Sequence, residues 1–134
     1  MMTFSDIRGA LQERLATMPL EYPVAWENVK FEPNGEIYLR ATLLTGATDQ
    51  FCLGESGSNE TSGIFQVDVF YPKGKGQDCI PDQIANWFER QFLTLNETTV
   101  RCRGVSVLQG EDDKNYFIVP VQIVYQAITG ARKP

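Results

Sequence analysis

The alternation of apolar and polar residues is clearest in the middle of the chain, where it predicts a strand. From Phe65 to Tyr71 the odd positions are apolar, whereas Gln66 and Asp68 are polar. A period of two places these two sets on opposite faces of a pleated strand. Pro72 cannot donate to a β-ladder, so the strand is expected to end there. The apolar face of this strand then needs a cover.

Two helices are predicted from apolar residues that recur at three- and four-residue spacing. The first extends from Thr3 to Met18, and Pro19 ends it. The second begins near Ile80, where Pro81 suits the first turn of a helix, and it is expected to cover the central strand. The expected apolar stripes are Phe4, Ile7, Leu11, Leu15 and Met18 in the first helix, and Ile84, Trp87, Phe88 and Phe92 in the second.

Further period-two patterns predict strands at residues 37–43, 100–107 and 117–125. In the second of these, the apolar phase changes across Gly104, which predicts a β-bulge at that glycine. The last two strands are expected to pair antiparallel. Pro120 removes a backbone donor from the last strand, which predicts either an edge position or a local irregularity.

Residues 45–62 are mostly small or polar, and they predict a long flexible loop or a distorted hairpin arm. Irregular connections of this length are uncommon in compact domains unless they are disordered or contact a partner, and the sequence leaves both readings open. The chain as a whole, residues 1–134, is expected to form one domain. The order of elements predicts an α+β fold, a mostly antiparallel twisted sheet with two α-helices packed on one face. The other face would meet water or a neighbour.

Composition argues against several classes of function. The formal net charge is −5, and beyond Arg132–Lys133 there is no basic block, so direct nucleic-acid binding is not expected. No run of about 18 apolar residues suggests a membrane span. The chain has no histidine and only three widely spaced cysteines, which argues against nucleophilic triads and thiolate metal sites. No catalytic, cofactor-binding or metal-binding residues are therefore predicted.

Charged residues on predicted strands suggest a subunit interface instead. Asp68 is the only acid within a strongly patterned segment, and no second acid can be placed beside it for acid–base chemistry. Arg101 and Arg103 share one strand face, where they would be solvated in a monomer or pair with acids of a neighbouring subunit. The residues predicted to form a subunit interface are Phe51, Leu53, Arg101, Arg103 and Asp68.

Three segments carry a resemblance to a known family. Val24–Asn28 after the first helix, Gly63–Pro72 with the turn and helix that follow, and Val121–Tyr125 together resemble the tail-terminator-like proteins of long-tailed bacteriophages. The resemblance implies a structural virion protein without catalytic residues. Such a protein forms a hexameric ring on the tail tube, stops tube polymerisation and offers a surface for joining the head.

The resemblance also implies partners and a location. The partners would be other copies of the chain, the tail tube protein and a head-completion protein, without a cofactor. The protein would be assembled in the host cytoplasm and reside in the virion tail. Two alternatives stay open: another phage tail or head–tail completion protein, or a small α+β ligand-binding domain.

Overall fold

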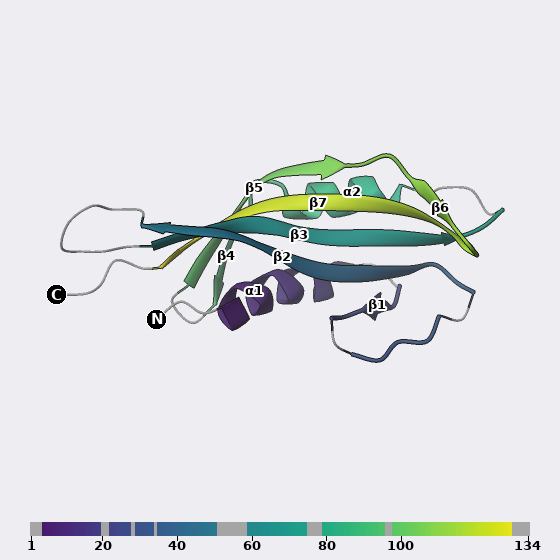
Figure 1. The fold of residues 1–134 in the computed structure, drawn as a ribbon, viewed down its shortest axis with the longest axis horizontal. Helices are drawn as coiled ribbons and strands as arrows, with labels where there is room; N and C mark the ends of the chain where they lie inside the picture. The colour runs from purple at the N-terminus through teal and green to yellow at the C-terminus, as the bar shows by residue number, and fades with distance from the viewer. Residues whose placement is uncertain are drawn as a thin grey trace.

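The computed structural model describes residues 4–19, 22–27, 29–33, 35–50, 59–74, 79–95 and 98–129, and it is an α+β fold. Two helices accompany long, twisted strands (Figure 1). No described helix is long and apolar enough to span a membrane. The elements in chain order are α1 (Phe4–Ala16), β1 (Val24–Ala25), β2 (Tyr38–Gln50), β3 (Asn59–Pro72), α2 (Ile80–Phe88), β4 (Phe92–Leu95), β5 (Thr98–Val107), β6 (Glu111–Asp113) and β7 (Tyr116–Thr129).

The described strands form one mostly antiparallel sheet, in the order β1-β2-β3-β7-β5-β4. Only the short β1 pairs in parallel, with Leu39 and Arg40 of β2. The acidic β6 lies beside β7 near its start. The predicted antiparallel pairing of the strands at residues 100–107 and 117–125 is confirmed by the β5–β7 ladder.

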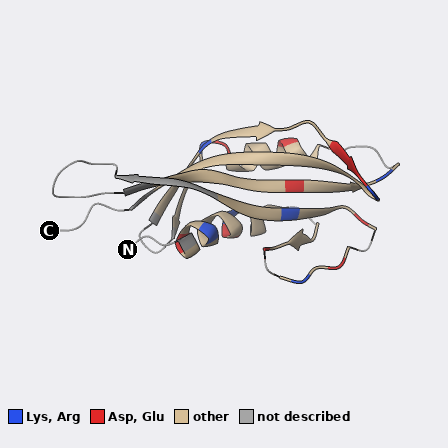
Figure 2. Ribbon diagram, in the orientation of Figure 1, with Lys and Arg blue, Asp and Glu red and all other residues tan. Residues whose placement is uncertain are grey.

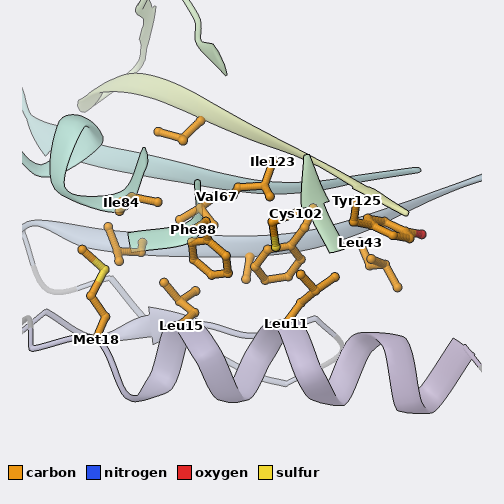
Figure 3. Packing of buried hydrophobic residues seen from close by; sticks show 14 of the residues in the cluster. Leu11, Leu15, Met18, Leu43, Val67, Ile84, Phe88, Cys102, Ile123 and Tyr125 are labelled. Carbon is orange, nitrogen blue, oxygen red and sulfur yellow. The ribbon is translucent and has the colours of Figure 1, made fainter. Parts of the chain in front are cut away.

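The core contains the apolar set of each predicted strand together with residues of both helices. Residues 65, 67, 69 and 71 of β3 are almost fully buried, and they join the same cluster as α1 and α2 (Figure 3). The predicted stripe of α1 is confirmed for the members whose side chains are described. The buried helix residues of the cluster are Ile7, Ala10, Leu11 and Leu15 of α1, and Ile80, Ile84 and Phe88 of α2; Met18, in the turn after α1, is buried with them.

The predicted stripe of the second helix is wrong at Phe92. The helix ends at Phe88, and Arg90 has a φ of 58°, a left-handed conformation that redirects the chain into β4. Phe92 is therefore the first residue of a strand and is 66% exposed. Trp87 packs against the core without being buried in it. Its indole N–H donates to the carbonyl of Arg14 at 2.7 Å, which ties α2 to α1.

The bulge predicted at Gly104 is confirmed. The β5–β7 register shifts between Cys102 and Gly104, so Arg103 is the extra residue. Val100 and Cys102 are fully buried, whereas Arg101 and Arg103 are exposed.

Pro120 lies at a local irregularity and not at an edge, because β7 runs between β3 and β5. The β5 ladder ends at Val107 and the β6 ladder begins at Glu111, so Pro120 lies opposite the interruption between them. Its carbonyl accepts from the N–H of Leu108 at 2.9 Å. In an antiparallel ladder the N–H and the C=O of a residue point to the same neighbouring strand. The backbone nitrogen of Pro120, which has no hydrogen to donate, therefore also faces this interruption, where no ladder hydrogen bond is lost.

The expected flexible loop at 45–62 is corrected for most of its length. Strand β2 continues to Gln50 and β3 begins at Asn59, and these two residues pair antiparallel. The register shifts between Thr45 and Thr48, as in a distorted hairpin arm. Pairing satisfies the backbone groups of this polar segment, which a free loop would leave to water. Residues 51–58 lie outside the described part of the chain.

Cys102 is expected to be unreactive in the folded protein. Burial raises the pKa of its thiol to about 11, so at pH 8 only about one thiol in a thousand is the reactive thiolate. In a Cys52→Ser, Cys79→Ser variant, a colorimetric thiol reagent should label no thiol within minutes, and one thiol after unfolding in denaturant. Full labelling of the folded variant at the rate of a free thiol would contradict the burial of Cys102.

Candidate functional site

The sheet face that points away from the core, here called the outer face, carries a hydrogen-bonded polar network. The register places Arg40 beside Asp68, and Gln66 between Thr42 and Gln122. Oδ2 of Asp68 accepts from Nε of Arg40 at 3.1 Å and from Nη2 at 2.9 Å, while Oδ1 accepts from Gln66 at 2.8 Å. Gln122 donates to Gln66 at 2.9 Å. The network thus ties together β2, β3 and β7.

The two charges of this network are unequally exposed. The Asp68 side chain is 2% exposed, whereas that of Arg40 is 51% exposed and lies 4.9 Å from the ring centroid of Phe70. The pair offsets the cost of burying the carboxylate. Because Asp68 is buried and Arg40 is exposed, the charged group that this part of the outer face offers to a partner is the guanidinium of Arg40. The role of Asp68 in a subunit interface stays a prediction.

Apolar side chains border the network on both sides. On one side, Tyr38 stacks on Phe70 at 4.3 Å between ring centroids, and Tyr116 meets both rings edge-on. Burial raises the pKa of Tyr38, and Tyr116 raises it further. On the other side, Leu44 pairs with Ile64 and Ile64 with Val124. Leu44 and Val124 are 44% and 40% exposed. Tyr38 and Phe70 are buried, so the apolar surface that another protein could cover beside the network is that of Leu44 and Val124.

The residues predicted as an interface do not come together in the described structure. Arg101 pairs with Gln126, which pairs with Ser62, six residues along β3 from Asp68. At a rise of about 3.3 Å per residue, that separation is roughly 20 Å. The guanidinium of Arg101 instead lies 5.6 Å from the ring centroid of Phe92. Arg103, the extra residue of the bulge, lies two residues from Arg101 on β5 and is exposed. Phe51 and Leu53 lie outside the described part of the chain.

A cleft of about 350 Å³ opens near the β1 end of the sheet, between residues 25–33 and β2. The carboxylate of Glu27 accepts from the backbone N–H of Leu43 at 2.7 Å, and this hydrogen bond satisfies one backbone donor of β2. Sequence reasoning missed both this cleft and Arg40. The signal for Arg40 was its position on the polar side of the predicted strand 37–43, opposite Asp68 once the two strands are aligned antiparallel. The described residues contain no cluster of three potential metal ligands.

Comparison with known families decides the identity. A family model described as phage tail terminator protein matches residues 6–125. The chain belongs to the phage tail terminator family. The resemblance predicted from the sequence is thereby confirmed. The family is structural, so this terminator-family protein is a component of the phage tail that contacts other tail proteins.

Comparison with solved structures supports the fold over the whole chain. One solved structure, whose description names no function, is 28% identical to this terminator-family protein and superposes with a TM-score of 0.74. The match covers 100% of this chain and 99% of the other. No curated protein sequence matches the chain.

Proposed function

We propose that the protein forms a closed hexameric ring on the end of the phage tail tube, stops further polymerisation of the tube and provides the surface to which the head is joined. The observation that carries the proposal is the family match over residues 6–125. The partners are the tail tube protein and a head-completion protein. No catalytic step and no cofactor enter this function, because the protein acts by occupying a surface.

In this proposal both helices cover one face of the sheet and leave the outer face for neighbours. The support is the shared core, in which Leu11 of α1 and Phe88 of α2 belong to one cluster with the odd-numbered residues of β3. The outer face then presents the Arg40 guanidinium and the exposed Leu44 and Val124. A face of this kind suits contact with flat protein surfaces at the end of a tube.

Ring formation requires contacts between two different surfaces of neighbouring copies, because such contacts close when the rotation between neighbours is a simple fraction of a turn. The exposed Arg101 and Arg103 are proposed to lie at one of these surfaces. Phe51 and Leu53, which follow β2 in the sequence and lie outside the described residues, stay proposed contributors.

The test of the ring is the mass of the protein as a function of concentration. Analytical ultracentrifugation should show monomers when dilute and hexamers when concentrated, and dilution should reverse the assembly. Arg101→Glu with Arg103→Glu should abolish the rings. Each interface loses about 1 to 2 kcal/mol, and six contacts multiply this to roughly 6 to 12 kcal/mol per ring. The thermal midpoint of the monomer should hardly change, because both side chains are exposed.

A matched control is Lys73→Glu with Lys114→Glu, which changes the net charge equally at two other exposed positions. This control should still form rings. Purified tail tubes offered the wild-type protein should stop growing, and tubes offered the arginine variant should continue. A wild-type protein that stays monomeric at high concentration and on tail tubes would contradict the proposed function.

A further inference from the structure

We propose that neighbouring subunits are joined by Phe92 of one copy, which inserts into the cleft between residues 25–33 and β2 of the next copy. The proposal rests on the proposed ring and names the contact that closes it. Two features carry it: an exposed apolar side chain on β4, and a cleft beside β2 whose walls contain several aromatic side chains.

Phe92 is the most exposed of the large apolar side chains that the structure describes. It is 66% exposed on β4, the strand at one end of the sheet order. Phenylalanine gains most from burial when a partner covers its whole ring, about 150 to 250 Å² of surface. The guanidinium of Arg101, 5.6 Å from the ring centroid, places a positive charge beside this apolar side chain. Phe92 and Arg101 together have the composition of an interface anchor, since aromatic residues and arginine dominate such anchors.

The cleft has a size and a lining that fit an aromatic side chain. Its volume of about 350 Å³ lies at the low end of the range of ligand pockets, roughly 300 to 1,000 Å³. The rim residue Val29 is itself 59% exposed and would be covered by an inserted ring. The walls combine aromatic faces with two charged groups. The lining residues that the argument uses are Trp26, Glu27, Val29, Phe31, Tyr38 and Arg40.

The charges around the two features have opposite signs. Segment 22–42, which contains all the lining residues of the cleft, carries three glutamates, one lysine and one arginine, a net charge of −1. Segment 90–103, which includes Phe92, carries three arginines and one glutamate, a net charge of +2. Figure 2 shows the acidic positions on the chain between β1 and β2. Complementary charges around an apolar contact favour encounter in one orientation and disfavour pairing of like surfaces.

Phe92 and the cleft lie on different surfaces of the subunit, so a contact between them joins two different surfaces of neighbouring copies. Strand β4 and strand β1 are the two ends of the sheet order, and they lie apart in Figure 1. Phe92 lies on β4, whereas the cleft is lined by residues of β1, β2 and the chain between them. A contact that joins one end of a subunit to the opposite end of the next is heterologous. Repetition of such a contact produces a closed ring when the rotation permits closure.

Cysteine cross-linking tests the contact directly. In the Cys52→Ser, Cys79→Ser background, Thr94→Cys is placed on one copy and Val29→Cys on another, and a short bismaleimide is added to the concentrated protein. Thr94 is exposed and lies two residues from Phe92 on the same side of β4, so the Phe92 ring is kept. The mixture should yield a covalent dimer, whereas either variant alone should yield almost none, because the contact joins different surfaces. A matched control replaces Thr94→Cys by Leu108→Cys, at a side chain that is 39% exposed elsewhere on the chain. This control should give almost no dimer.

Association should also weaken in the absence of any cross-linker. Phe92→Ala is expected to weaken self-association at least about tenfold, as for an interface anchor, with an unchanged thermal midpoint. Leu108→Ala should change self-association less than twofold. If the wild type forms rings but Phe92→Ala associates normally and the mixed cysteines do not cross-link, the ring stands and this contact is wrong. A wild type that never assembles would instead overturn the proposed function itself.

Discussion

Phe88→Ala is expected to lower the free energy of unfolding by about 3 to 5 kcal/mol, the range for truncating a fully buried phenylalanine. Phe88 is 0% exposed, and its ring centroid lies 5.9 Å from that of Phe65 on β3. Alanine would leave a cavity between α2 and the centre of the sheet (Figure 3). Because α2 has only nine residues, few other contacts can compensate for the loss. Urea unfolding monitored by circular dichroism measures the effect.

Trp87→Ala provides the comparison, because it removes a larger side chain from the adjacent position. Trp87 is only half-buried, and its ring lies 3.9 Å from the guanidinium of Arg14. The variant loses this contact, one hydrogen bond and part of the packing against the core, together about 2 to 3 kcal/mol. Arg14 keeps its two hydrogen bonds to the carbonyl of residue 87, since that acceptor belongs to the backbone. A larger loss in Trp87→Ala than in Phe88→Ala would show that the core assignment is wrong.

The parts of the fold that follow from local pattern were predictable. The period of two located the central strand because a sheet with one buried face forces every second residue to be apolar. The change of phase at Gly104 located the bulge for the same reason. Helix α1 followed from its single apolar stripe.

The end of the second helix was not predictable in the same way. Apolar residues recur at helical spacing from Ile84 to Phe92, so the pattern continues beyond the actual end at Phe88. The chain leaves the helical path at Arg90, whose backbone is left-handed. Glycine is the residue that usually signals this conformation, so an arginine at this position gives no sequence signal for it. Strand β4 was missed as a consequence, and with it the exposed position of Phe92.

The candidate site was only partly visible in the sequence because its contacts are long-range. Asp68 was recognisable as an acid within a strand, but its partner Arg40 lies 28 residues away and depends on the β2–β3 register. The partner of Asp68 is a cation on the neighbouring strand and not the second acid that an acid–base pair would need. The cleft is built partly from residues 25–33, a mostly irregular segment whose position no periodicity predicts.

Arg40→Ala is expected to destabilise the protein more than Asp68→Asn, although the two side chains form one pair. Removal of Arg40 leaves a carboxylate that is 2% exposed, and among the described residues Gln66 remains as its side-chain donor. An uncompensated buried charge costs about 3 kcal/mol. Asp68→Asn keeps the shape and leaves a guanidinium that is 51% exposed and can be hydrated, so the expected loss is about 1 kcal/mol.

The double variant Arg40→Leu, Asp68→Leu separates the cost of an unpaired charge from the contribution of the pair itself. If the asymmetry arises from the buried carboxylate, removing both charges should restore most of the stability lost in Arg40→Ala, because no ion is then left without a partner. Chemical denaturation of all four proteins at pH 7 measures this directly. Equal losses in the two single variants would show that the carboxylate becomes hydrated when Arg40 is removed. Arg40 would then act chiefly as a surface contact, and its main effect would be sought in ring assembly and not in folding.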